Sequence, residues 1–414
     1  MTEMHAVRDP LWKHIYLPQK LYEACFTKEF LRLSNIKQLG PTYMVYPGAT
    51  HTRASHSFGV YHIANRLLDN LLHKGASQWV TKTGCASFRA AALFHDLGHF
   101  PYTHSLKELP LLDHEQLTGS IILNSSISHY ITASGGNPEQ TAQIVDTSIL
   151  TDNTETLFFR KLLSGVLDPD KLDYLNRDAF FCGVPYGIQD TDFVLSTIIP
   201  DKERGIILSS SAILSVENLL FSKYLMYRAV YWHKTVRIAT AMMKKTLYTA
   251  LQNEIIEPRE LYTLDDQGLY SLLENKEYFE ELECADAVKQ RRIYSVLYEV
   301  SFSPDNSFHT NLEKLDFRFM SEIQLAQIIS CKPYQILIDI PERVSFESDL
   351  WIQDENTVFS QSSTVFTSDT VSSFTAKLRK VRCAIDPGFI RHVSETDIIN
   401  LKKLIEDFFS MQYT

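Results

Sequence analysis

The features that mark several common protein classes are absent from this 414-residue sequence. No stretch approaches the roughly 18 consecutive apolar residues that a membrane helix needs. The first ten residues, MTEMHAVRDP, lack the apolar segment of a signal peptide. We therefore expect a cytoplasmic protein with no membrane partner.

Paired cysteines, excess basic charge and two common catalytic motifs are also missing. The six cysteines are scattered and include no CxxC pair, which argues against a disulfide framework and against a zinc-thiolate site. The net charge of -10 argues against a protein that coats nucleic acid electrostatically. Neither the phosphate-binding GxxxxGK motif nor the GxSxG nucleophile elbow occurs. Any anionic ligand therefore needs a local basic pocket.

Histidine, in contrast, is concentrated in one part of the chain. Eleven of the 14 histidines precede residue 130, where an even distribution would place about four. The string FHDLGHFPYTH places His95, Asp96, His99 and His104 at the end of an apolar stretch. Imidazole and carboxylate are metal ligands, and burying so many polar groups without a partner is costly. We interpret this string as part of a metal or acid–base site.

Apolar residues recur at spacings of three and four over most of residues 54–255 and predict helices. The segment Ala86–Phe94 is nearly all apolar and predicts a buried helix. Residues 168–178 begin with Asp168 as an N-cap and proline at the first helical position. Residues 212–253 contain no proline or glycine and predict one long helix.

The residue pattern of the sequence changes towards the C-terminus. Residues 256–330 look helical and charged, whereas the β-branched runs after residue 330 predict a small α+β lobe. Eleven Ser or Thr among residues 357–376 predict a polar hairpin or mobile loop, and Ser394 with Asp397 forms the capping box of a final helix. We therefore expect a mainly α protein with domains over 1–255, 256–330 and 331–414.

Two other segments offer candidate ligands. Arg53 and His56 share one face at the start of a helix, where one can hold a phosphate oxygen and the other a metal. In DPDKLDYLNRD, Asp170, Tyr174 and Asp178 are spaced by four and share a face. Taken alone, this second pattern is more typical of a salt-bridged surface helix.

One stretch stands out from the acidic chain. Between Glu217 and Glu254 there is no Asp or Glu, and six Lys or Arg give +6. On a helix, one face would present Lys223, Tyr227, Tyr231 and Lys234, which suits a ligand with phosphates and a ring. The alternative is an amphipathic helix with a solvated basic side.

These segments together resemble the HD superfamily of metal-dependent phosphohydrolases. The H…HD…D pattern maps onto His56, His95, Asp96 and Asp170. More narrowly, the strings IKQLGPTYMVYPGATHTRASHSFGVYH, ALFHDLGHFPYTH, DHEQ and LDPDKLDYLNRDAFFCGV are similar to the deoxynucleoside triphosphate triphosphohydrolase (dNTPase) branch. The resemblance covers roughly residues 1–250 and implies an HD-type helical core that hydrolyses dNTPs to deoxynucleoside and inorganic triphosphate.

The resemblance also implies roles for individual residues. His56, His95, Asp96 and Asp170 would bind a divalent metal, whose identity (Mg, Mn, Fe, Zn, Ni or Co) is left open. His104 would be the general acid, in a group of catalytic residues formed with His99, His114 and Glu115, and Glu115 would fix the tautomer of His114. The implied substrate contacts are Arg53 and Lys171 with phosphates, Gln38, Leu39, Tyr174 and Asp178 with the sugar, and Lys223, Tyr227, Tyr231 and Lys234 on the long helix.

Departures from the family pattern limit what is carried over. Lys223 stands where relatives often have Arg, and Lys107 stands where some have an acidic residue. Phe26 and Ser34 lie in the segment that binds an activating guanine nucleotide in some relatives. Activation by GTP is therefore not expected. The alternatives are another HD phosphohydrolase or phosphodiesterase and a nucleotide-sensing or nucleic-acid-sensing HD protein, with single-stranded nucleic acid as a second candidate partner. Relatives assemble as dimers or tetramers, so the resemblance also implies a homodimer or homotetramer.

Overall fold

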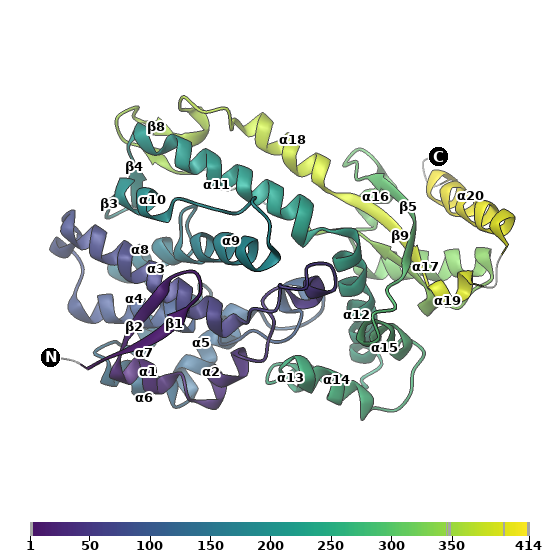
Figure 1. Ribbon diagram of the computed structural model, residues 1–414, viewed down its shortest axis with the longest axis horizontal. Coiled ribbons are helices and arrows are strands. Elements are labelled where there is room, and N and C mark those ends of the chain that lie inside the picture. The colour runs from purple at the N-terminus through teal and green to yellow at the C-terminus, as the bar shows by residue number, and fades with distance from the viewer. Residues whose placement is uncertain (1–2, 345, 347–348, 392–393, 412–414) are drawn as a thin grey trace.

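A helical core occupies the first half of the chain (Figure 1). The structure, a computed structural model, describes residues 3–344, 346, 349–391 and 394–411. An antiparallel hairpin, β1 (Met4–Asp9) and β2 (Lys13–Pro18), precedes the core. The helices that follow are α1 (Gln19–Ala24), α2 (Lys28–Leu33), α3 (Arg53–His73), α4 (Lys82–Phe94), α5 (His114–Asn124), α6 (Ile127–Ala133), α7 (Pro138–Val145), α8 (Thr154–Leu163), α9 (Pro169–Cys182) and α10 (Thr191–Thr197). The expected mainly α class is confirmed.

Local signals set the ends of the helices that carry the predicted site. Thr52 caps α3, because its side chain accepts from Ser55 N and Ser55 returns a bond to Thr52 N. Asp168 caps α9 as expected, accepting from Lys171 N at 2.6 Å, and Gly183 ends that helix with a φ of 66°. Helix α4 is mostly buried, as its apolar sequence predicts.

The single long helix expected over residues 212–253 is wrong. Helix α11 (Ile213–Met226) runs into a π-helical turn, Tyr227–Tyr231, and α12 (Lys234–Gln252) starts afresh. Trp232 N bonds to Tyr227 O at 2.8 Å, and His233 caps α12 by accepting from Thr235 N. The interruption rotates the faces of α12 relative to those of α11.

Two small sheets connect the end of the chain to the helical core. The four-stranded sheet is ordered β3 (Ile198–Asp201), β4 (Gly205–Leu208), β7 (Trp351–Ile352) and β8 (Thr357–Val358), and its β4–β7 pair is parallel. The antiparallel three-stranded sheet is ordered β5 (Ser295–Ser301), β9 (Lys380–Ile385) and β6 (Ile336–Asp339). Strand β5 lies in a stretch expected to be helical, so that expectation is only partly correct.

The remaining helices are α13 (Pro258–Leu261), α14 (Asp266–Glu274), α15 (Leu282–Lys289), α16 (Ser307–Asn311), α17 (Leu315–Ile329), α18 (Ser368–Leu378), α19 (Pro387–Ile390) and α20 (Glu395–Met411). The expected polar hairpin over residues 357–376 is wrong, because most of its second half is α18. This helix lies along α11 in Figure 1, and its Phe374 ring is 4.5 Å from that of Tyr224. The predicted capping box is confirmed: Ser394 Oγ lies 2.6 Å from Asp397 Oδ2 and accepts from Asp397 N.

Candidate active site

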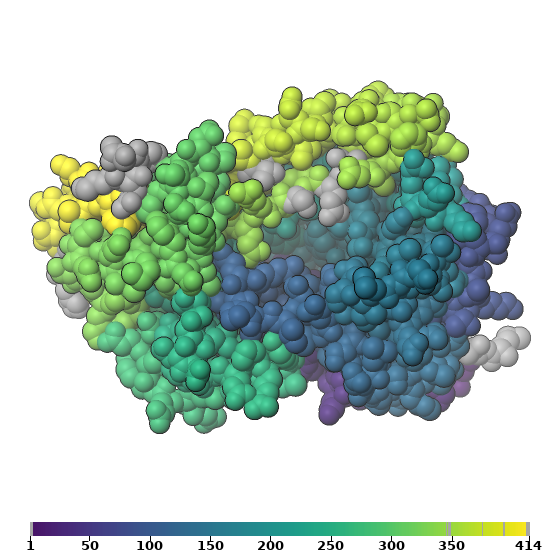
Figure 2. All heavy atoms as spheres, turned by 180° about the vertical axis from the view of Figure 1, so that it is seen from behind, coloured from purple at the N-terminus to yellow at the C-terminus, as the bar shows by residue number. Residues whose placement is uncertain are grey.

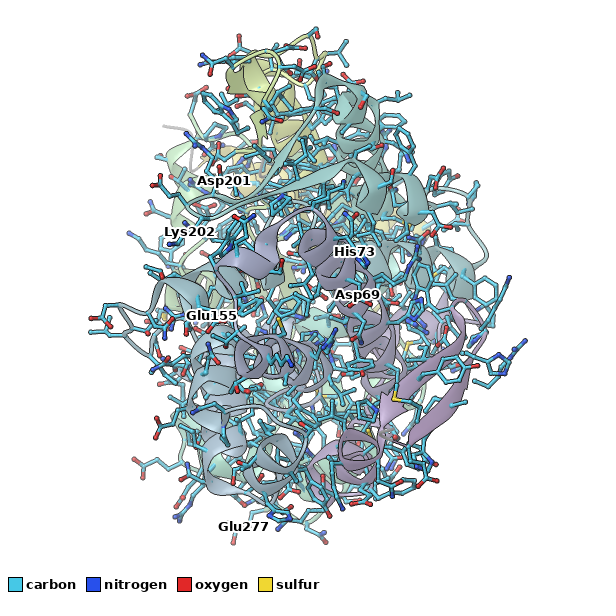
Figure 3. The ribbon with its side chains drawn as sticks, turned by 90° about the vertical axis from the view of Figure 1, so that its left-hand side faces the viewer. Asp69, His73, Glu155, Asp201, Lys202 and Glu277 are labelled. Carbon is cyan, nitrogen blue, oxygen red and sulfur yellow. The ribbon has the colours of Figure 1, made fainter. Side chains whose placement is uncertain are left out.

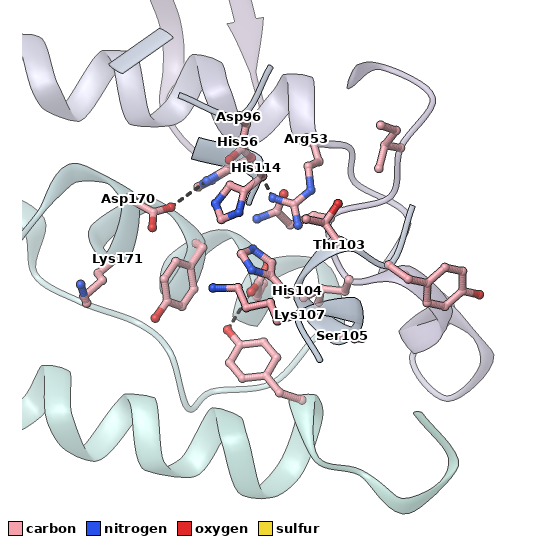
Figure 4. A pocket seen from close by; sticks show the side chains of 18 of the residues that line it. Arg53, His56, Asp96, Thr103, His104, Ser105, Lys107, His114, Asp170 and Lys171 are labelled. Carbon is pink, nitrogen blue, oxygen red and sulfur yellow. Dashed lines mark hydrogen bonds and ion pairs between the residues drawn. The ribbon is translucent and has the colours of Figure 1, made fainter. Parts of the chain in front are cut away.

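A cavity of about 620 Å³ lies between α3, α9, the loop joining α4 to α5, and the α11–α12 segment. The close view in Figure 4 shows side chains from these separate elements converging on it. Seen from behind, the surface is hollowed between the blue atoms of the core and the yellow-green atoms of the C-terminal segment (Figure 2). Every residue that the sequence predicted for the site lines this cavity except His99 and Lys234.

The four predicted metal ligands come from three elements. His56 lies in the first turn of α3, His95 and Asp96 directly follow α4, and Asp170 lies in the first turn of α9. His56 Nε2 is 2.9 Å from Asp170 Oδ1. His95 Nε2 is 3.2 Å from Asp96 Oδ1 and 3.9 Å from Asp170 Oδ1.

These residues fit a divalent cation. Two ligands about 2.1 Å from one ion lie about 3 to 4.2 Å apart, which brackets most of the distances above. One ligand atom each from His56, His95 and Asp96 lies within 4.8 Å of the others. His95 Nε2 is buried and has no hydrogen-bond partner among the described residues. Two imidazoles and two carboxylates are a donor set suited to Mn, Fe, Zn or related ions.

Electrostatics also prepare this position for a cation. Burial lowers the pKa of His56, but hydrogen bonds to Asp170 and Asp173 outweigh it and raise that pKa to about 10. Burial would raise the pKa of Asp96, yet His95, His99 and Arg53 hold it well below its usual value. Protein without metal therefore keeps a proton on His56 where a metal would bind, and binding displaces it.

Asp173 is a supporting residue that the sequence interpretation missed. Its Oδ2 lies 2.8 Å from His56 Nδ1 and orients that ring, while Arg177 bonds to both carboxylate oxygens at 2.7 and 2.9 Å. Arg177 also donates to Asp9 of the N-terminal hairpin at 2.8 Å. Gly59 makes room for this packing, since a Cβ there would lie 1.9 Å from Asp173 Oδ1. The position of Asp173, one turn after Asp170, was the available signal.

A second group of histidines lies beside the metal ligands. His99 Nδ1 is 3.2 Å from Asp96 Oδ1, and its Nε2 is 3.1 Å from His104 Nε2. The rings of His99 and His114 are 4.0 Å apart. His99 lies behind the cavity wall, whereas His104 and His114 line the cavity. Among the described residues no hydrogen bond joins Glu115 to His114, whose Nδ1 is unpartnered, so the expected contact that would fix its tautomer is wrong.

Burial keeps these imidazoles neutral. It lowers the pKa of His99 well below its usual value and that of His114 to about 4, and the charge of Arg53 adds to both shifts. Arg53 itself donates to Asp96 Oδ2 at 2.8 Å and lines the cavity. Without a ligand, the site therefore offers uncharged ring nitrogens next to a fixed guanidinium.

The other cavity walls carry cations and aromatic rings. Lys171 Nζ donates to Asp168 at 2.8 Å, and Lys223 Nζ lies 5.4 Å from the Phe346 ring centroid. The aromatic residues that line the cavity are Phe100, Tyr102, Tyr174, Tyr227, Tyr231 and Trp232. Both oxygens of Asp178 are occupied, one by Tyr231 at 2.7 Å and one by His51 at 2.8 Å. His51, to which the sequence assigned no role, therefore orients Asp178.

Most cations of the acid-free segment do not face the cavity, which corrects the predicted basic surface. Lys234 is exposed and lies outside the cavity, because the break before α12 turns it away. Arg237, Lys244 and Lys245 form ion pairs with acidic residues from other segments, namely Asp339, Glu108 and Glu322. Of the predicted face, Lys223, Tyr227 and Tyr231 line the cavity, and Arg237 also lines it although Asp339 pairs with it.

Some of the early histidines lie far from this site. His73 is exposed at the end of α3, next to Asp69 on the outer face of the molecule (Figure 3). Its Nδ1 lies 2.6 Å from Asp69 O. His129 is also exposed, so part of the histidine excess is ordinary surface usage.

Two models of known protein families match parts of this chain. The HD domain model matches residues 53–155, which contain three of the four candidate metal ligands. The chain contains an HD domain. A second model, the HD associated region, matches residues 195–384. The two segments meet at the cavity, since residues from both line it.

Individual proteins show the same relationship. The chain is 35% identical to the uncharacterised protein YwfO of Bacillus subtilis over 67% of its own length and 62% of that protein. It is 24% identical to human deoxynucleoside triphosphate triphosphohydrolase SAMHD1 over 81% of its length and 60% of that protein. The chain thus matches less than two thirds of either relative. A crystal structure of a hypothetical protein from Aquifex aeolicus covers 97% of the chain and is itself fully covered, with 25% identity and a TM-score of 0.74.

No helix among the described residues is both long and apolar enough to span a membrane.

Proposed function

We propose that this HD-domain protein is a metal-dependent phosphohydrolase that converts deoxynucleoside triphosphates to deoxynucleoside and inorganic triphosphate. The observation that carries the proposal is that one cavity is lined by the four candidate metal ligands, by His104 and His114, and by cationic side chains that include Arg53, Lys171 and Lys223. The similarity to SAMHD1, whose name states this activity, supports the choice of substrate. Resemblance to the same branch also leads us to propose a homodimer or homotetramer.

His56, His95, Asp96 and Asp170 would hold the metal. When bound, such an ion polarises a phosphoryl oxygen and lowers the pKa of a water molecule, which supplies the nucleophile. Asp173 keeps the Nδ1 of His56 occupied, so that its Nε2 would be the atom available to a metal. Arg53 fixes Asp96 from the other side through its ion pair.

The cationic side chains would bind the triphosphate. Lys171 and Lys223 line the cavity on α9 and α11, and Arg53 lies at the start of α3. Together they offset most of the roughly four negative charges that a nucleoside triphosphate carries near neutral pH. The substrate charge also acts on the histidine cluster, because a nearby anion favours the imidazolium form.

His104 would then protonate the departing 5′ oxygen. It lies in the cavity, and its Nε2 faces His99, which contacts Asp96 in turn. A bound phosphate supplies the negative charge that stabilises a proton on His104. His99 orients His104 from behind, and His114 and Glu115 complete the wall on this side.

The remaining wall suits a sugar and a base. Gln38 Oε1 is buried and has no hydrogen-bond partner among the described residues, so it can accept from a sugar hydroxyl. Leu39 and Tyr174 add apolar contact, and Tyr231 is held by Asp178. Rings at this wall can stack against a nucleobase.

The test is product analysis with each dNTP and NTP in the presence of Mg²⁺, Mn²⁺ or Co²⁺. We expect deoxynucleoside and intact triphosphate in equal amounts, and no turnover by Asp96→Ala. Release of single phosphate or pyrophosphate would instead identify another class of HD phosphohydrolase. Binding without turnover would identify a sensor.

A further inference from the structure

The loop over residues 97–113 presents His104 to the cavity and has little regular structure of its own. It contains a single 3₁₀ turn, Thr103–Leu106, between α4 and α5. Its apolar side chains Phe100, Leu106 and Leu109 are buried in a cluster formed with α12, α14 and α15 of the HD associated region. The position of this loop therefore depends on a part of the chain outside the HD domain.

Glu108 joins the 97–113 loop to the HD associated region by ion pairs. Its carboxylate accepts from Arg318 of α17 at 2.8 and 3.2 Å and from Lys244 of α12. The side chains of Lys244 and Arg318 are each 6% exposed, and that of Glu108 is 19% exposed. Glu108 does not line the cavity, although Ser105 and Lys107 beside it do.

The two cations depend unequally on Glu108. Arg318 also bonds to the carbonyls of Leu312 and Glu313, whereas Glu108 is the acidic partner of Lys244 among the described residues. An unpaired buried charge has a high free-energy cost. Displacement of the loop would leave Lys244 and Arg318 without their acidic partner, so the position of the loop with both ion pairs formed is strongly favoured. The two partners come from different helices and hold the carboxylate in two directions.

We propose that Glu108 is a positioning residue for hydrolysis. Its ion pairs with Lys244 and Arg318 hold the 97–113 loop in the position that keeps His104 in the cavity. The expected effect on kcat rests on the proposed function. The expected effect on the position of the loop rests on the ion pairs alone. This positioning gives Lys244 and Arg318 of the HD associated region a role in catalysis without direct contact with the reacting atoms.

The chain contains a matched control for this test. Lys245 of α12 and Glu322 of α17 form another buried ion pair, at 2.6 Å, between the same two helices. Glu322 also accepts from Ile338 N. This pair has no hydrogen bond to the 97–113 loop in the described part of the chain, so breaking it loosens the helices without releasing the loop directly.

The experiment compares Glu108→Gln with Glu322→Gln in the full-length protein. For Glu108→Gln we expect kcat for dNTP hydrolysis to fall at least tenfold relative to Glu322→Gln, with KM and bound metal per chain within twofold of wild type. Amide hydrogen exchange should rise in peptides from residues 97–113 in Glu108→Gln only. Glu108→Asp, which keeps the charge, should recover part of kcat.

The outcomes separate the two proposals. Equal kcat in the two glutamine variants, or equal loop exchange, would overturn the positioning role of Glu108. If wild-type protein releases no triphosphate, the proposed function fails, and the exchange measurement still decides whether Glu108 holds the loop. Should Glu108→Gln not fold, Arg318→Lys keeps the charge but loses the two-pronged contact, and it should show the same loop-specific exchange.

Discussion

Replacing Asp173 by Asn should weaken metal binding although Asp173 does not reach the proposed ion. Asp173 is fully buried and accepts from His56 Nδ1 at 2.8 Å, so it fixes which ring nitrogen of His56 is free for the metal. Asparagine keeps the size but turns an NH2 group towards either His56 or the Arg177 guanidinium. Loss of such a supporting carboxylate typically weakens metal affinity 10- to 100-fold, or about 1.4 to 2.7 kcal/mol.

The assay is titration of metal-free protein with Mn²⁺ or Co²⁺ by calorimetry. Asp9→Asn is the matched control, because Asp9 also pairs with buried Arg177 at 2.8 Å but has no contact with His56. Both variants should lose stability, on the order of 3 kcal/mol for a broken buried ion pair. Only Asp173→Asn should lose metal affinity. An unchanged dissociation constant for Asp173→Asn, or an equal loss of affinity in Asp9→Asn, would show that Asp173 does not support the metal through His56.

Further predictions follow from the same geometry. Lys223→Met should raise KM for a dNTP at least tenfold, whereas Lys234→Met, outside the cavity, should leave KM within twofold in the same steady-state assay. Gly59→Ala should displace Asp173 and reduce metal bound per chain, measured by elemental analysis; full occupancy would contradict the packing described. The pKa of Glu108 is lowered from 4.5 to about 2, with its cationic partners outweighing burial, so its contribution to stability is complete above pH 4.5 and lost as pH falls towards 2. Urea unfolding should show this loss, about 3 kcal/mol in full, in wild type and not in Glu108→Gln. Chelation should lower stability by about 2.7 kcal/mol when the metal had been at 100 times its dissociation constant, and scanning calorimetry with metal added back should show full recovery.

The residues that the sequence located correctly carry local signals. Asp168 caps its helix, and the candidate metal ligands His95 and Asp96 directly follow an apolar helix whose burial was predictable from its composition. Motif spacing together with family resemblance placed His56 and Asp170 in the same site, and both line the cavity. Each of these inferences depends on neighbouring residues in the sequence or on a recurrent motif.

The inferences that failed depend on distant partners. Lys234 was placed on the substrate face by assuming an unbroken helix, and the π-helical turn before it has no simple sequence signal. The count of +6 could not show that Lys244 would meet Glu108 or that Lys245 would meet Glu322, since these partners are far away in the sequence. Asp173 was overlooked because its importance depends on how α9 packs against α3.

The parallel pairing of β4 with β7 has a consequence for how the protein is made. Leu208 pairs with Ile352, so two strands about 140 residues apart must meet before this sheet can form. Cavity residues also extend to Val344, which leaves the ribosome well after the HD domain. Long-range pairing of this kind slows folding and leaves apolar surface exposed in the meantime. A nascent chain that stops after α12 should therefore be a client for chaperones, and activity should appear only when nearly the whole chain has been synthesised.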